Sequence, residues 1–162
     1  MSLFDVCQWL QDSTLGAALR GSRYVFPLVE TSHVLGLAIS VGLILVTDLR
    51  LVGAALTREP VADVMKQLRT WMLSGFLVMF VSGGLLFWSE AARLYDSPTF
   101  RAKLIFLFLA GVNALVFETT VGKSVVDWNT IVPPRAKFAG WASLICWAGV
   151  IIFGRWTAYG LN

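Results

Sequence analysis

The sequence has little charge for its length. Asp, Glu, Lys and Arg make up 14% of its 162 residues, against about 25% in a typical soluble domain. The deficit is concentrated in four long apolar blocks, and the mean hydropathy is +0.71. Such blocks exclude an ordinary soluble globular protein and predict an integral membrane protein. The net charge of +3 is small, and the basic residues lie in short loops beside the blocks, which indicates membrane topology and not nucleic-acid binding.

Histidine and cysteine are also scarce. One histidine and two cysteines are too few for a structural zinc site, which takes four such ligands. Cys7 lies in the N-terminal segment and Cys146 in the last apolar block, so the pair does not indicate a disulfide, and Cys146 is predicted to be a small buried hydrophobe. No nucleophile–histidine–acid triad, phosphate loop or nucleic-acid motif is present. Nor does the N-terminus have the basic region and cleavage site of a signal peptide.

The apolar blocks predict an all-α fold, a polytopic membrane four-helix bundle in one transmembrane domain over residues 1–162. Each helix is expected to be longer than the bilayer requires. The predicted spans cover residues 26–46, 71–88, 104–117 and 138–153. Four spans place both termini on one side of the membrane.

Local signals predict where several helices begin. Pro60 is expected to start the second helix, and Ser97-Pro98 is typical of an N-cap followed by proline at the first helical position. Pro133-Pro134 precedes the fourth span. Residues 3–19 mix apolar and polar positions in a way that predicts a short helix lying in the membrane interface.

Loop charges favour one orientation. The side that carries the termini has four basic residues and the other side has six, once Arg50, Lys103 and Arg155, at or inside the lipid boundary, are left out. The two groups are Arg20, Arg23, Arg93 and Arg101, and Arg58, Lys66, Arg69, Lys123, Arg135 and Lys137. By the positive-inside rule the first and third loops are cytoplasmic.

Two ionisable residues lie inside the first span. Glu30 and His33 are three residues apart and therefore share a helical face. A rise of ~1.5 Å per residue puts His33 about 13 Å along the helix, near the middle of the membrane. Gly36 and Ser40 continue the same face, so this polar, small-residue stripe should contact protein and not lipid. An ionisable residue at such a depth in the membrane indicates a functional site.

Three roles for His33 remain open. A neutral imidazole is a ligand for heme iron, copper or zinc, and Glu30 could orient the ring or contact a heme propionate through water. Alternatively, His33 hydrogen-bonds across to another helix, with Asn113 or Ser82 as partner. The third role is a proton relay.

Heme needs one strong axial ligand and a flat apolar slot, which the many small residues of the spans can provide. Copper could instead use the thioethers of Met72 and Met79 together with His33, although methionines at helical spacing more often pack in a core. Lys103, at the start of the third span, either extends to the interface or pairs with a carboxylate, from Glu30 or from a cofactor.

The chain resembles a bacterial family of small four-helix membrane proteins of unknown function. The likeness rests on residues 26–36 (FPLVETSHVLG), on Gly42 and on residues 48–53 (DLRLVG), and it extends over nearly the whole chain. It implies the fold and a bacterial inner membrane, in which the loop charges put the termini on the periplasmic side.

A more distant likeness concerns the first helix, with its early histidine and later Arg50, and the Lys103-Leu104 pair. In these features the chain is similar to HemJ-type protoporphyrinogen oxidases and CopD-type copper-resistance proteins. The resemblance implies that His33 is a heme or copper ligand and that Arg50 and Lys103 lie at carboxylates of the cofactor or substrate. Where those families often carry a further histidine, this chain has Asn113 or its neighbours. Ligation of heme by two histidines of one chain is therefore excluded.

The prediction for function is a membrane protein that binds heme b and takes part in electron transfer or a heme-linked redox step. His33 is the expected iron ligand. The other expected cofactor-binding residues are Glu30, Gly36, Ser40, Arg50, Lys103 and Asn113. A heme so bound would be five-coordinate, would take Met or water as its sixth ligand, or would be shared in a homo-oligomer, and a redox partner protein is expected. The alternatives are a non-catalytic accessory or assembly subunit and a carrier of copper or a small solute.

Overall fold

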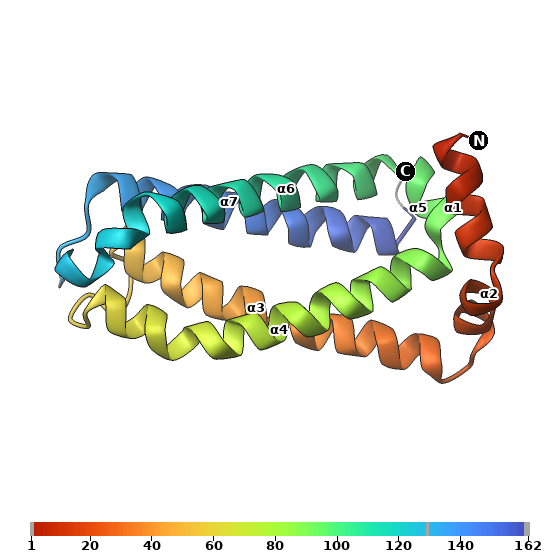
Figure 1. Cartoon of the computed structure of the whole chain (residues 1–162), viewed down its shortest axis with the longest axis horizontal. Coiled ribbons are helices and arrows are strands. Elements are labelled where there is room, and N and C mark those ends of the chain that lie inside the picture. Colours follow the sequence, from red (N-terminus) through yellow and green to blue (C-terminus); the bar gives the residue numbers. More distant parts are fainter. Residues whose placement is uncertain (1, 129, 161–162) are drawn as a thin grey trace.

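Four long helices form the body of the protein in the computed structural model, which describes residues 2–128 and 130–160 (Figure 1). They are α3 (Val25–Val52), α4 (Val61–Ser89), α6 (Pro98–Thr119) and α7 (Pro134–Ala158). Each is long and apolar enough to cross a membrane, and the described residues contain no strand. The predicted all-α bundle is confirmed, and the chain is a multi-pass membrane protein.

The N-terminal segment forms two helices where the sequence predicted one. α1 (Leu3–Asp12) and α2 (Thr14–Gly21) are separated at Ser13. The Ser13 hydroxyl donates to the Leu10 carbonyl at 2.6 Å and accepts from the Gly16 amide at 3.2 Å, so one side chain ends the first helix and caps the second. Both helices lie across the end of the bundle at which α7 finishes (Figure 1).

The predicted helix starts are confirmed. α4 begins directly after Pro60, and α7 begins at Pro134. The Ser97 hydroxyl accepts from the Phe100 amide at 3.3 Å and caps α6. The connections contain two short elements that the sequence did not predict, α5 (Ala91–Asp96) and the 3₁₀ helix η1 (Val121–Trp128).

Helices α3 and α4 cross at small residues. A Cβ atom added at Gly75 would lie 2.8 Å from the Ser40 amide nitrogen, and one added at Gly36 would lie 2.9 Å from the Met79 amide nitrogen. Only glycine permits the two backbones to approach so closely. Beside this crossing lies the central core, where Cys146 is buried as predicted; the other buried members are Val41, Met79, Ala110, Trp147 and Val150.

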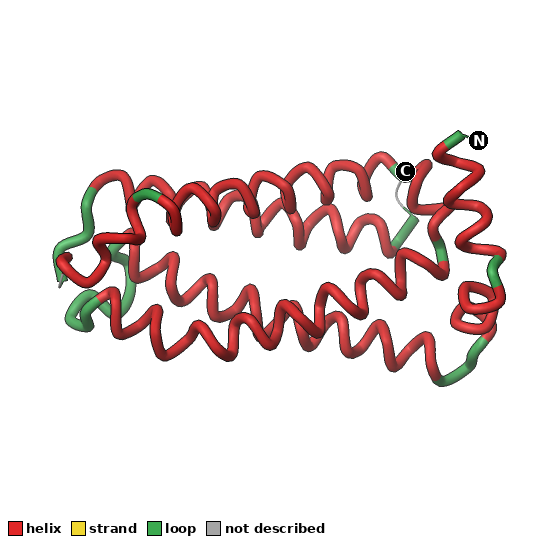
Figure 2. Tube along the Cα trace, in the orientation of Figure 1, coloured by secondary structure: helices red, strands yellow, loops and turns green. Residues whose placement is uncertain are grey.

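The packing between α3 and α7 differs between the two halves of the bundle. In the half with the α3–α4 and η1–α7 loops, α3 packs on α7, and a Cβ at Gly140 would lie 3.1 Å from Leu51. Arg50 is 1% exposed there and donates to the carbonyls of Glu59 at 2.8 Å and Thr130 at 3.2 Å. Toward the other end α3 diverges from the α6–α7 pair (Figure 2). The space that this divergence opens contains the candidate site.

Candidate ligand cavity

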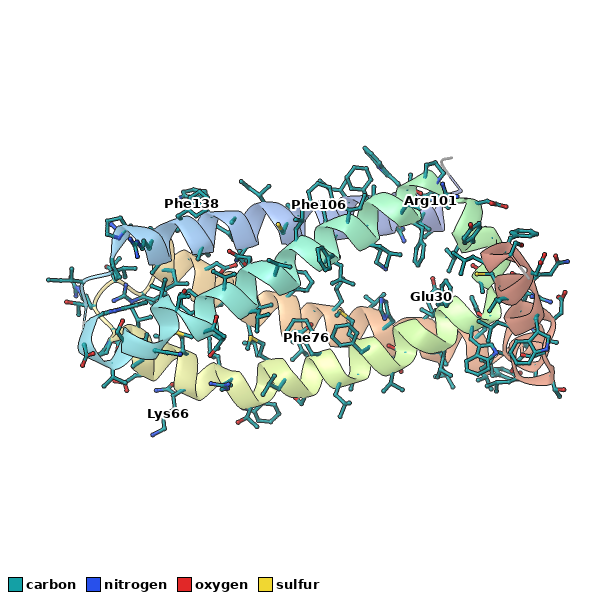
Figure 3. The ribbon with its side chains drawn as sticks, turned by 45° about the horizontal axis from the view of Figure 1, so that its top comes forward. Glu30, Lys66, Phe76, Arg101, Phe106 and Phe138 are labelled. Carbon is teal, nitrogen blue, oxygen red and sulfur yellow. The ribbon has the colours of Figure 1, made fainter. Side chains whose placement is uncertain are left out.

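A cavity of about 470 Å³ lies in the half of the bundle that carries the N-terminal helices, and residues of all four long helices and of α5 line it. Its volume is in the range of small-molecule and cofactor sites. Three of the predicted site residues line this one cavity: Glu30 and His33 from α3 and Lys103 from α6. The label of Glu30 shows where the cavity lies in Figure 3.

The orientation of His33 is set by α4. Its Nδ1 atom lies 3.0 Å from the Met79 carbonyl oxygen and 3.2 Å from Ser82 Oγ. A carbonyl oxygen can only accept, and the Ser82 hydroxyl already donates to the Val78 carbonyl at 2.6 Å. The proton therefore belongs on Nδ1, and Nε2 keeps its lone pair. No residue in the described part of the chain hydrogen-bonds Nε2.

Gly83 leaves room for the imidazole ring. A Cβ atom at this position would lie 3.0 Å from His33 Cε1 and 3.3 Å from Nδ1. The Cε1–Nδ1 edge of the ring thus lies against α4 at a point where a larger residue would push it away. Gly83 also lines the cavity. Both contacts position an imidazole whose second nitrogen is unused by the protein.

Charged side chains line the outer part of the cavity. Glu90 and Arg93 neutralise each other at 3.1 Å, and theirs is the one ion pair within residues 2–128 and 130–160. The aliphatic stem of Lys103 runs along Gly154, with Cδ 3.5 Å from the position of a Cβ there. Arg155 donates to the Tyr159 hydroxyl at 2.6 Å. Lys103 and Arg155 therefore supply two positive charges that no carboxylate of the described chain pairs.

The deeper part of the cavity is apolar. Leu37, which follows His33 by one helical turn, and Val150 lie on its lining. Apolar side chains also line the part nearer the end of the bundle, among the charged residues: Phe26, Leu86, Phe87, Leu94 and Phe100. Glu30 is one turn nearer the end of the bundle than His33. The cavity is therefore complementary to an amphipathic molecule with an apolar body beside His33 and anionic groups toward Lys103 and Arg155.

The four other predicted site residues lie outside this lining. Gly36 and Ser40 belong to the α3–α4 crossing, where the Ser40 hydroxyl donates to the Gly36 carbonyl at 2.7 Å. Arg50 holds two loops at the opposite end of the bundle. Asn113 joins α6 to α7 by donating to the Ala139 carbonyl at 3.0 Å, so it is Ser82 and not Asn113 that meets His33.

Sequence reasoning left Arg155 out of the predicted site and named Gly83 only as one of several small residues that could form a heme slot. Arg155 was placed at the lipid boundary and left out of the site. Its place beside Lys103 could have been found from topology, because the start of the third span and the end of the fourth lie on one side of the membrane. Gly83 has no such signal, since only the angle between α3 and α4 decides which glycine meets His33.

The methionines of the copper hypothesis do not share the cavity with His33. Met79 is buried in the central core, with its sulfur 3.9 Å from Ser40 Oγ, and neither Met72 nor Met79 is on the lining. Within the described ranges, no three His, Cys, Asp or Glu side chains are grouped closely enough to hold a metal ion. The cavity thus offers one nitrogen ligand and no preformed multidentate set.

The fold and the cavity define a class, the α-helical multi-pass membrane proteins with an amphipathic cavity at one end of the bundle. The chain belongs to a family of unknown function, DUF6644, whose model matches residues 6–160. A search of curated proteins and a search of solved structures each found no match. The predicted membership of an uncharacterised family is confirmed, and no finding supports the likeness to HemJ-type or CopD-type proteins.

Proposed function

We propose that the protein binds heme b in this cavity, with Nε2 of His33 as axial ligand, and serves electron transfer or a heme-linked redox step. The observation that carries the proposal is the hydrogen bond from Nδ1 to the Met79 carbonyl. Such a bond on the second nitrogen selects the tautomer that ligates metal, holds the ring in place and raises the basicity of the ligand. Bound heme supplies reversible one-electron chemistry at its iron.

The charges and the apolar lining support the same proposal. Heme b is an apolar macrocycle with two carboxylates on one edge. Of the cations on the cavity lining, Lys103 and Arg155 are the two that no described carboxylate pairs, and each can hold one propionate by a charge-assisted hydrogen bond. Glu30, on the same lining, would contact a propionate through water.

The lining also bears on the sixth coordination position. It contains no methionine, no cysteine and no second histidine among the described residues. His33 would therefore be the one ligand that the lining supplies to the iron, and a His–Met centre is not expected. As part of the proposal, the protein resides in a bacterial inner membrane with periplasmic termini, forms homo-oligomers and exchanges electrons with a partner protein.

One observation favours a second candidate, an accessory or assembly subunit without cofactor. The contacts of His33 with Met79 and Ser82 join α3 to α4, and by themselves they are a sufficient structural role for a buried histidine. In that case His33 matters for packing only, and the purified protein is colourless. A copper or small-solute carrier lacks a comparable observation, because the thioether sulfur of Met79 is turned to Ser40.

The test is a visible spectrum, oxidised and dithionite-reduced, of protein purified in detergent from cells supplied with heme. We expect a b-type spectrum that His33→Ala abolishes and that millimolar imidazole restores in the same variant. Ser82→Ala is the matched control, because it removes a structural contact of His33 but leaves the ligand, and it should retain heme. A colourless wild-type protein would refute the heme proposal. Equal losses in His33→Ala and Ser82→Ala, without imidazole rescue, would favour the accessory subunit.

A further inference from the structure

The wall of the cavity differs between its two sides. On the α4–α6 side, the rings of Phe87 and Phe100 stack with centroids 5.9 Å apart and planes 15° apart. Both residues line the cavity, so their stack closes the space between the two helices at this depth. The α4–α6 side is therefore closed at the level of this aromatic pair.

The end of the bundle beside α4 and α5 is covered by the N-terminal helices. Arg20 of α2 donates to the Ser89 carbonyl at 3.1 Å, and the indole of Trp88 donates to Ser13 at 2.9 Å. The side-chain oxygen of Gln11 accepts from the Ala92 amide at 3.1 Å. These three bonds fix α1 and α2 across the path from that end (Figure 1).

Among the residues that the structure describes, no aromatic stack or side-chain hydrogen bond joins α3 to α7 beside the cavity. The packing between these helices lies at the central core and at Gly140, in the other half of the bundle. Val34 of α3 and Ile151 of α7 both line the cavity, yet they are 56% and 46% exposed. Residues that line a cavity and are also half exposed mark an opening in its wall.

This opening faces the bilayer and not the aqueous phase. Val34 follows His33 directly and is thus near the middle of the span. From Val34 to Ile39 α3 is apolar, whereas the polar segment from Glu30 to His33 precedes it, toward the end of the bundle. A ligand that enters here must be dissolved in the hydrocarbon region.

We infer that the ligand of this cavity enters and leaves sideways from the bilayer, between α3 and α7, through a portal bounded by Val34 and Ile151. The ligand class is accordingly a membrane-dissolved amphiphile with an anionic edge, whose apolar body passes the portal while its carboxylates follow the membrane surface toward Lys103. The inference rests on the proposed function in so far as heme is the ligand, but the portal would serve any flat amphiphile of this class.

The test measures rates of uptake from a membrane. Wild-type and variant proteins are reconstituted in phosphatidylcholine vesicles and mixed with vesicles that contain heme or metal-free protoporphyrin IX. Heme binding is followed by its Soret band, and protoporphyrin binding by quenching of tryptophan fluorescence. The portal variants are Val34→Trp and Ile151→Trp. The matched controls are Leu35→Trp and Ile152→Trp, at neighbouring positions that are 59% and 47% exposed and do not line the cavity.

We expect each portal variant to slow association and dissociation together by at least tenfold, with the equilibrium affinity unchanged, and each control to match the wild type. Equal rates in portal and control variants would overturn the inference. A loss of affinity with unchanged or faster dissociation would also overturn it, because a blocked portal must slow entry and exit by the same factor. Protoporphyrin IX separates the two proposals because it needs no axial ligand. If protoporphyrin is taken up with the expected rate pattern but heme is not ligated, the portal inference stands and the proposed heme function is refuted. A wild-type protein that takes up neither would overturn both.

Discussion

The close crossing of α3 and α4 predicts a marked sensitivity to one added methyl group. In Gly75→Ala, the new Cβ would lie 2.8 Å from the Ser40 amide nitrogen and 3.1 Å from the Gly36 carbonyl oxygen. Both neighbours are backbone atoms of α3 and cannot rotate away. Ordinary van der Waals contact begins near 3.4 Å, so the helices must separate by about 0.6 Å at a tightly packed point.

The magnitude follows from two opposing effects. Overpacking at a well-packed contact costs about 1–3 kcal/mol, whereas alanine in place of glycine favours a helix by up to ~1 kcal/mol. We expect Gly75→Ala to lower the free energy of unfolding by about 1–2 kcal/mol. The separation should also lengthen the His33–Met79 bond, now 3.0 Å, because it spans the same two helices.

Gly84→Ala is the matched control. It lies in the same helix, and a Cβ there would have no neighbour within 4 Å, so the variant should be as stable as the wild type or slightly more stable. Unfolding is measured by titration with sodium dodecyl sulfate from a mild detergent, followed by far-ultraviolet circular dichroism. The reasoning fails if Gly75→Ala is as stable as Gly84→Ala, since the two differ only in the space around the added methyl.

Two further changes test the opposite end of the bundle. Arg50→Ala should cost roughly 3 kcal/mol, because it removes a fully buried side chain and its charge-assisted bonds to two loop carbonyls; the same titration should show Arg58→Ala, at an exposed loop position, unchanged. Gly53→Ala should cost about 1 kcal/mol, because the C-cap of α3 has φ +85°, a left-handed conformation that residues with a Cβ disfavour. Gly21→Ala, which meets neither a positive φ nor a neighbour, should be neutral in thermal unfolding, and an equal loss in the two glycine variants would contradict the cap argument.

Local sequence signals specify the spans, most helix starts and the all-α class. These features depend on local properties, since long apolar runs, a serine N-cap before Pro98 and the prolines at positions 60 and 134 act within one or two turns of the chain. It also placed Glu30 and His33 on one face, because a helical face follows from spacing alone. The break at Ser13 was missed, although serine is a common cap, because caps are weak signals inside a short segment.

The tertiary structure alone decided which polar residues meet. Gly36 and Ser40 share the helical face of His33, yet the crossing of α3 and α4 buries them in a helix contact and leaves His33 and Glu30 on the cavity. Arg50 donates to a loop carbonyl and Asn113 to a helix carbonyl, both away from the cavity. Lys103, from a helix distant in sequence, lines the cavity. The physical reason is that the cavity arises from the divergence of α3 and α7. That angle results from the packing of small residues across all four helices, which no single stretch of sequence encodes.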